Sequence, residues 1–236
     1  MLVRDRMSTP AITAETSTSL AEALGMMRRL GIRRLPVLQR SRLVGIVTWT
    51  DLMRAQPSLV AGVDAEAASA FLERTAVRAI MSPGPMTIGP DAPIEAAAVI
   101  MRREKIGGLP VVEKRSLLGV VTESDIFEAF IDLTGLRQGG ARLVVDLSGR
   151  ANAIAGLAAI ADGAGVPLDS LATYQQCDRR LAVVRVAVPY PLHLVEALSE
   201  GGFPVLHLAA PPSESDATRG KRRYSTYSRA WESAAR

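Results

Sequence analysis

Two short stretches of the chain, 45–51 and 119–125, share the pattern Gly-x-x-Thr-x-x-Asp, which places a hydroxyl and a carboxylate three residues apart. Each stretch runs from an apolar segment into a helical pattern, where free backbone N–H groups and the positive end of the helix dipole favour a phosphate. The Thr hydroxyl could donate to a phosphate oxygen, and the Asp could accept both hydroxyls of a ribose diol. The candidate phosphate- and ribose-binding residues are therefore Thr48, Asp51, Thr122 and Asp125.

The same spacing also has a purely structural explanation. A Thr-x-x-Asp sequence at the start of a helix is close to a capping box, in which the two side chains satisfy each other's backbone N–H groups. Capping and ligand binding explain either stretch alone about equally well. The occurrence of both stretches in the same duplicated context shifts the balance towards a ligand site.

That context is an internal repeat. A shift of 74 residues aligns residues 3–55 with 77–129 without a gap and gives 19 identities in 53 positions. Gapless similarity at this level indicates a duplication, and two copies of this length indicate a paired module rather than a solenoid. One copy alone would bury too little surface, so the two copies should pack together.

Each copy predicts the element order β-α-β-β-α over about 55 residues. In the first copy a capping box at Ser19 begins a helix that Gly31 ends, and a hairpin and a second helix follow. In the second copy Pro93 is expected in the first turn of the equivalent helix. The predicted elements are helices over 20–30 and 94–101, and strands over 35–38, 43–47, 109–112 and 117–121.

These paired units resemble tandem CBS domains, a Bateman module, over roughly residues 1–134. Both copies share the Val-x-x-x-Met-Ser opening, the Leu-Pro-Val strand and the Gly-x-x-Thr-x-x-Asp ending. The resemblance implies a regulatory module that binds AMP, ADP, ATP, S-adenosylmethionine or a dinucleotide in clefts between the repeats. It places phosphate and ribose at the Thr and Asp residues. It also implies a base pocket lined by Thr13, Ile32, Arg33, Arg34, Thr87, Ile106, Gly107 and Gly108.

The two copies differ immediately before Leu-Pro-Val. Arg33 and Arg34 in the first copy correspond to Gly107 and Gly108 in the second. Two guanidinium groups beside a cleft would favour a multiply charged ligand, whereas glycines permit a close backbone approach. The arginines are equally well explained as solvated or interface residues. We expect two inequivalent sites.

The second half has the order β-α-β-β-α-β of a ferredoxin-like fold, after a glycine-rich boundary at 135–140. It resembles an ACT domain, in which Asp146 and Gly149 belong to the turn before the first helix. Ser148 replaces the usual Pro there, and Ala151 stands where a larger apolar residue is common. The resemblance implies dimerisation or binding of a second ligand, and the whole chain resembles the acetoin-utilisation AcuB type of regulatory protein.

Composition excludes several other classes. The 236 residues are 48% hydrophobic and 22% charged, as in ordinary globular proteins. No uncharged stretch approaches the roughly 18 apolar residues of a membrane helix, and the charged N-terminus has no signal-peptide core. The single cysteine, Cys177, excludes an internal disulfide and a multi-cysteine metal site. We expect a soluble, cytoplasmic protein without a metal site.

An enzyme is the main alternative from another class. His193 and Glu196 have helical spacing but lie in an otherwise apolar segment, and His207 has no evident partner in its predicted strand. No nucleophile is paired with a base. We therefore expect no catalytic residue and no catalytic cofactor.

The tail, residues 211–236, carries six basic and three acidic residues, and so supplies most of the net charge of +4. Its composition predicts disorder. Tyr224, Tyr227 and Trp231 lie among its basic residues, so contact with nucleic acid or an acidic partner is an alternative to a solvated tail or an interface strap.

The sequence thus predicts an α/β (α+β) protein with two CBS repeats packed as a pair and a ferredoxin-like, ACT-like domain. The expected function is a non-catalytic sensor of an adenosyl ligand that forms a homodimer and acts on a protein target the sequence does not identify. A dimerisation scaffold with vestigial sites and an enzyme subunit are the alternatives. The expected domains are repeat 1 over 1–57, a linker helix and repeat 2 over 58–134, the ACT-like domain over 139–210 and the tail over 211–236.

Overall fold

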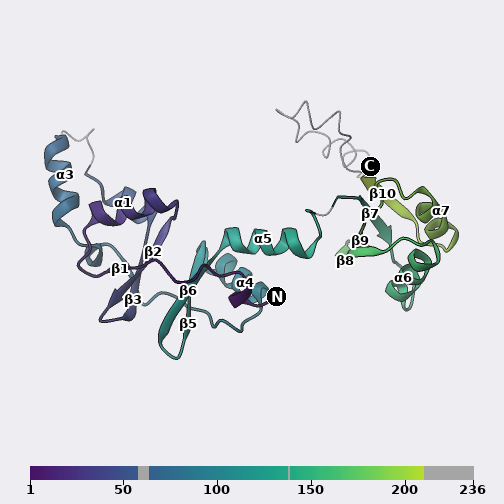
Figure 1. Ribbon diagram of the computed structural model, residues 1–236, viewed down its shortest axis with the longest axis horizontal. Helices are drawn as coiled ribbons and strands as arrows, with labels where there is room; N and C mark the ends of the chain where they lie inside the picture. Colours follow the sequence, from purple (N-terminus) through teal and green to yellow (C-terminus); the bar gives the residue numbers. More distant parts are fainter. Residues whose placement is uncertain (58–63, 138, 210–236) are drawn as a thin grey trace. The chain divides into compact units, whose positions relative to one another are not determined.

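The computed structural model describes residues 1–57, 64–137 and 139–209 (Figure 1). It divides into two compact units, Met1–Phe130 and Ile131–Arg236. The predictions about the tail lie outside the described residues. Within the described part of the chain, no helix is long and apolar enough to cross a membrane.

The first repeat has the predicted β-α-β-β-α order. Its elements are β1 (Ala14–Glu15), α1 (Leu20–Leu30), β2 (Arg34–Gln39), β3 (Arg42–Thr48) and α2 (Trp49–Ala55). Ser19 Oγ accepts a hydrogen bond from the Glu22 N–H at 3.1 Å, and Gly31 ends α1 in the left-handed conformation with a φ of 65°. Arg40 and Ser41, between β2 and β3, both have positive φ, as in the type I′ turns that match the twist of a hairpin.

The second repeat reproduces this arrangement with two local differences. Its elements are α4 (Ile94–Glu104), β5 (Gly108–Glu113), β6 (Ser116–Thr122) and α5 (Glu123–Leu133), and its first strand is reduced to one parallel bridge between Ile88 and Val111. The prediction for Pro93 was wrong by one position. Pro93 is the N-cap, because its ψ of 142° is extended, and its carbonyl accepts a hydrogen bond from the Ala96 N–H at 3.0 Å. Lys105 ends α4 with a φ of 55°, where α1 has Gly31.

The opening segments of the two repeats are exchanged. Val3 is fully buried in the core of the second repeat, and Val77 is fully buried in the core of the first. Backbone hydrogen bonds join Ser8 to Val120 at 2.9 and 3.1 Å. Each exchanged valine stabilises the other repeat by roughly 1.5–3 kcal/mol through burial, so the two repeats form one interlocked pair. The remaining elements are the 3-10 turns η1 (Val3–Asp5) and η3 (Val77–Ala79), α3 (Ala65–Arg74) and β4 (Ser82–Pro83), which pairs with β3.

The second unit has the predicted β-α-β-β-α-β order of a ferredoxin-like fold. Its elements are β7 (Ala141–Asp146), α6 (Ala153–Gly163), β8 (Leu168–Gln176), β9 (Arg179–Val186), α7 (Leu192–Glu200) and β10 (Val205–Ala209). The sheet order is β10-β7-β9-β8, with every neighbouring pair antiparallel. One face of the sheet packs on both helices, through buried residues such as Leu143, Leu157 and Leu194 (Figure 1).

Candidate functional site

Both Thr-x-x-Asp motifs make the same hydrogen bonds. Asp51 Oδ2 accepts from the Thr48 N–H at 2.9 Å and from the Thr48 hydroxyl at 2.7 Å. Asp125 Oδ2 accepts from the Thr122 N–H at 2.7 Å and from the Thr122 hydroxyl at 2.8 Å. The Asp51 N–H also donates to Thr48 Oγ1 at 3.2 Å, which completes a capping box at the start of α2. The structural role foreseen for this spacing is therefore present.

These bonds determine what each side chain can still offer a ligand. The Thr122 hydroxyl gives its proton to Asp125, so its oxygen can accept a hydrogen bond, and it would have to leave Asp125 in order to donate to a phosphate. Asp125 Oδ1 takes part in neither bond to Thr122. A carboxylate oxygen has two lone pairs, so Oδ1 can accept from a ribose diol without breaking the cap.

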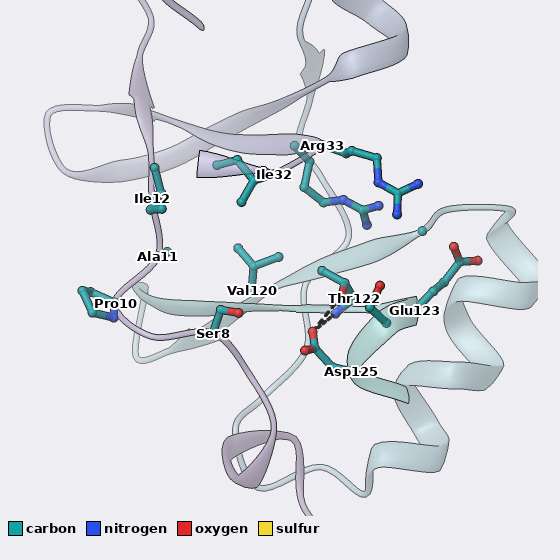
Figure 2. Close-up of a pocket in the computed structure, with 14 residues that line it drawn as sticks. Ser8, Pro10, Ala11, Ile12, Ile32, Arg33, Val120, Thr122, Glu123 and Asp125 are labelled. Carbon is teal, nitrogen blue, oxygen red and sulfur yellow. Dashed lines mark hydrogen bonds between the residues drawn. The ribbon is translucent and has the colours of Figure 1, made fainter. Parts of the chain in front are cut away.

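The second motif lines a cavity of about 330 Å³ within the first unit (Figure 2). Four parts of the chain meet there: the segment before β1, the turn between α1 and β2, the turn between α4 and β5, and the end of β6 with the first residues of α5. In Figure 2, Ile32 and Val120 approach the cavity from opposite sides, and Thr122 and Asp125 lie at one end. The lining residues are Ser8, Pro10, Ala11, Ile12, Gly31, Ile32, Arg33, Arg34, Gly107, Val120, Thr122, Glu123, Ser124 and Asp125.

The cavity brings together half of the residues predicted for a nucleotide site. The six that line it are Ile32, Arg33, Arg34, Gly107, Thr122 and Asp125. The other six, Thr13, Thr48, Asp51, Thr87, Ile106 and Gly108, do not line it. Sequence reasoning chose Thr13, whereas the residues that line the cavity in this segment, Ser8 to Ile12, come just before it. It also missed Glu123 and Ser124, which lie between Thr122 and Asp125 in the motif. The Met-Ser opening was the available signal for this segment.

Arg34 reaches from the first repeat to the backbone of the second. A Cβ placed on Gly107 would lie 2.7 Å from Arg34 Nη2 and 3.0 Å from Glu123 Oε2. A Cβ placed on Gly108 would overlap Arg34 Nη1. The glycines at these two positions therefore leave the space that the Arg34 guanidinium occupies. The sequence suggested that these glycines let a ligand approach the backbone closely. In the structure the Arg34 side chain makes that approach.

Charge at this end of the cavity is mixed. Burial lowers the pKa of the Arg34 guanidinium below its ordinary value; Glu123 and Asp125 oppose that shift, and Arg33 adds to it. An arginine remains protonated even so. The cavity thus offers two cations from the first repeat and two carboxylates from the second, with Arg33 exposed to solvent and Arg34 half-buried.

The turn expected in the second unit has defined local bonding. Asp146 Oδ1 accepts from the Ser148 N–H at 2.8 Å, Ser148 Oγ accepts from the Arg180 N–H at 3.1 Å, and Gly149 has a φ of 70°. Hydrogen bonds from Ser148, first from its hydroxyl and then from its N–H, lower the pKa of the Asp146 carboxyl. Ser148 thus ties the turn to β9.

The remaining candidates for chemistry are dispersed. His193 and Glu196 are exposed on α7, and Cys177 is an exposed free thiol between β8 and β9. His207 lies in β10, and its Nδ1 is buried without a hydrogen-bond partner. No group of three or more His, Cys, Asp or Glu side chains that could hold a metal ion occurs among the residues the structure describes.

Comparison with known proteins identifies the first unit. The family model of the CBS domain matches twice, at residues 3–58 and 77–132. A CBS domain-containing protein of Dictyostelium discoideum is 36% identical over 133 residues, which are 56% of this chain and 92% of that protein. The chain belongs to the CBS-domain family. The matched residues contain both Thr-x-x-Asp motifs and end before the second unit's sheet. Two further curated relatives are matched over only 21% and 23% of their own length.

Solved structures of CBS pairs are similar over the same half of the chain. A CBS domain pair in complex with 5′-methylthioadenosine and S-adenosyl-L-methionine is 31% identical and covers 55% of this chain and 95% of that chain, with a TM-score of 0.47. A protein of Vibrio cholerae provisionally assigned to acetoin utilization (AcuB) is 32% identical and covers 58% of this chain and 95% of that chain, with a TM-score of 0.49. Because both TM-scores are below 0.5, the family assignment rests on the sequence matches.

Proposed function

We propose that this CBS-domain protein is a non-catalytic sensor of an adenine nucleotide or another adenosyl ligand. The observation that carries the proposal is the cavity of about 330 Å³ that Asp125 and the start of α5 line within the CBS pair. This volume lies within the roughly 300–1,000 Å³ of small-molecule sites. AMP, ADP, ATP and S-adenosylmethionine are the candidate ligands, and Thr122 and Asp125 are the residues that recognise ribose and phosphate.

The surroundings of Asp125 support a definite orientation of the ligand. Asp125 Oδ1 accepts the ribose hydroxyls, and the positive end of the α5 dipole attracts a phosphate. The Glu123 N–H takes no part, because it donates to the Gly107 carbonyl at 3.1 Å. Apolar side chains on opposite sides of the cavity, Ile32 and Val120, contact the faces of the base (Figure 2). Ligand that fits one arrangement of the two repeats shifts the population towards that arrangement, which is how binding becomes a signal.

The second unit, in this proposal, is an ACT-like domain over residues 139–210 that joins two copies of the chain or binds a second ligand beside Asp146 and Gly149. Its β-α-β-β-α-β order and the tight Asp146–Ser148 turn support the assignment. The CBS pair over 1–134 then supplies the ligand response, and the second unit or the tail conveys it to a homodimer partner or to a protein target.

A scaffold with vestigial sites is the second candidate. The observation that favours it is that in each pair the Thr hydroxyl and N–H already donate to the Asp carboxylate, as they would in a motif that only begins a helix. On this alternative both motifs stabilise helices and neither meets a ligand.

Calorimetric titration of the full chain with AMP, ADP, ATP and S-adenosylmethionine separates the two candidates. Losing a hydrogen bond to a charged group costs about 1.5–3 kcal/mol, so Asp125→Ala should weaken binding roughly 10- to 150-fold. Asp51→Ala is the matched control, because it removes the same capping bonds from a motif that does not line the cavity.

A sensor returns its ligand unchanged, so the bound compound should be recovered intact by chromatography, whereas an enzyme subunit would consume it. Absence of binding by well-folded protein, or equal weakening by Asp51→Ala and Asp125→Ala, would refute the proposed site.

A further inference from the structure

The Arg34 side chain extends from the first repeat to the carboxylates of the second. Arg34, Glu123 and Asp125 all line the cavity. A Cβ placed on Gly107 would lie 2.7 Å from Arg34 Nη2 and 3.0 Å from Glu123 Oε2, so the guanidinium and the carboxylate both lie against this glycine. Figure 2 shows the side chains of Arg33 and Glu123 at the same end of the cavity. Positive groups of one repeat therefore meet negative groups of the other there.

The carboxylates near Arg34 do not offset its burial. The pKa of the Arg34 guanidinium stays below its ordinary value because burial outweighs Glu123 and Asp125, which both favour the charged form. Arg33, which also lines the cavity, adds a second positive charge. Once Asp125 Oδ1 holds a ribose, Glu123 is left to balance two guanidinium groups and the positive end of the α5 dipole. An anionic group on the ligand would improve this balance.

A phosphate suits these surroundings better than the group that S-adenosylmethionine carries at the same place. A guanidinium donates two parallel hydrogen bonds to two oxygens of a phosphate. Ser124, in the first turn of α5, also lines the cavity, and its hydroxyl can donate to a further oxygen. S-adenosylmethionine instead has a positively charged sulfur on the carbon that bears the phosphate in AMP. Arg33 and Arg34 would repel that charge.

We propose that Arg34 recognises the phosphate of an anionic adenine nucleotide, so that the cavity selects AMP, ADP or ATP over S-adenosylmethionine, and that Glu123 competes with the phosphate for Arg34. This inference rests on the proposed function, because it names the ligand class of that site. Arg34 belongs to the first repeat and Asp125 to the second, so a nucleotide that both residues hold couples the two repeats.

The test compares AMP with adenosine, which differ only in the phosphate. Titration calorimetry of the full chain should show that AMP, ADP and ATP each bind more tightly than adenosine and S-adenosylmethionine. Loss of a hydrogen bond to a charged group weakens binding roughly 10- to 150-fold, so Arg34→Gln should lower the AMP-to-adenosine affinity ratio by that factor. A purely structural role of Arg34 would weaken both ligands equally and leave the ratio unchanged.

The Glu123→Gln variant tests the competition, since it removes the charge and keeps the shape of the side chain. It should strengthen AMP binding roughly 2- to 5-fold, leave adenosine binding unchanged and have no effect in the Arg34→Gln background. Unchanged or weaker AMP binding in Glu123→Gln would overturn the competition.

Matched controls change the net charge of the chain by the same amounts away from the cavity. They are Arg42→Gln and Glu113→Gln. Arg42 begins β3 and Glu113 ends β5, both are exposed, and neither lines the cavity. Each control should keep the AMP-to-adenosine ratio of the wild type.

The outcomes separate this inference from the proposed function. Equal affinity of the wild type for AMP and adenosine, tighter binding of S-adenosylmethionine than of AMP, or an unchanged ratio in Arg34→Gln would overturn the role of Arg34 and leave a sensor of another adenosyl ligand in place. Arg34→Lys replaces Arg34→Gln if the latter does not fold, because it keeps the charge but loses the two parallel hydrogen bonds, and its ratio should also fall. Absence of binding of every ligand, adenosine included, to well-folded wild-type protein would overturn the proposed function and this inference with it.

Discussion

The Thr48–Asp51 and Thr122–Asp125 pairs share two hydrogen bonds but have different surroundings. In both, one carboxylate oxygen accepts from the threonine N–H and from its hydroxyl, at distances between 2.7 and 2.9 Å. The second pair lines a cavity of about 330 Å³, and the first does not line it. The motif therefore determines how a helix begins, whereas the residues around it determine whether it lines a cavity.

The difference between the copies comes from substitutions at positions that approach the motif across the pair. Arg34 lies against Gly108, the equivalent residue of the second repeat. A Cβ at position 108 would overlap the Arg34 guanidinium, so the Arg34 side chain requires a glycine there. Interior packing leaves no room for two guanidinium groups at such a contact. The duplicated module thus keeps both copies of the motif, while the residues at positions 34 and 108 differ.

The largest changes in stability are expected from substitutions in the cores of the two repeats. They test whether the two repeats unfold together. Leu35 and Leu109 are equivalent and fully buried, one in each core. Leu35→Ala and Leu109→Ala should each destabilise the first unit by roughly 2–5 kcal/mol. In a Trp231→Phe background, urea unfolding followed by Trp49 fluorescence reports on the first repeat.

Because Val3 and Val77 are exchanged between the cores, Leu109→Ala should lower the unfolding midpoint seen at Trp49 although it lies in the other repeat. An unchanged Trp49 transition in Leu109→Ala would mean that the repeats unfold independently.

A smaller effect should distinguish the ends of the two equivalent helices. Gly31 and Lys105 both adopt the left-handed conformation, with φ of 65° and 55°. A residue other than glycine costs roughly 1–2 kcal/mol there, part of which is offset by the lower entropy of its unfolded state. Lys105→Gly should therefore stabilise the first unit by about 0.5–1 kcal/mol, and Gly31→Lys should destabilise it by a similar amount.

A Cβ on Gly31 would meet no atom within 4 Å, so the effect of Gly31→Lys isolates the backbone conformation from packing. Thermal unfolding of the two single variants and of the double swap would measure it. If Lys105→Gly proved destabilising, the left-handed conformation would not be the source of the difference.

Much of the fold could be predicted from the sequence because its elements are specified locally. The Ser19 cap, the Gly31 stop and the alternating strands of the second unit depend on neighbours within a few residues, and the structure has them. The exchange of Val3 and Val77 could not be predicted, since a repeat in sequence does not show which copy an opening segment packs against. Pro93 was misplaced by one residue because both N-cap and first-turn positions tolerate proline.

The candidate site was predicted in part for the same reason. Thr122 and Asp125 follow from local spacing, and Ile32 and Arg33 follow from the family resemblance. The Arg-Arg and Gly-Gly difference predicts two inequivalent sites, and this stays a prediction. The position of the Arg34 guanidinium against Gly107 and Gly108 could not be predicted, because periodicity carries no information about that placement.

The smallest effect compares two arginines that the repeat makes equivalent. Arg28 Cζ lies 5.6 Å from the centre of the Trp49 ring, whereas its equivalent, Arg102, is exposed and the residue corresponding to Trp49 is Glu123. A cation over an indole at a partly exposed site contributes about 0.5–1 kcal/mol, so Arg28→Ala should cost that much. Arg102→Ala should stay within about 0.5 kcal/mol of the wild type.

The two helices give these arginines similar backbone surroundings, so the difference between the variants measures the contact with Trp49 rather than helix propensity. A double-mutant cycle of Arg28→Ala with Trp49→Leu, followed by urea unfolding monitored by circular dichroism, isolates the pairwise energy. A coupling of zero would show that Trp49 is held by the core of the first repeat alone. A coupling of the expected size would show that the indole ring is held both by the core of the first repeat and by Arg28.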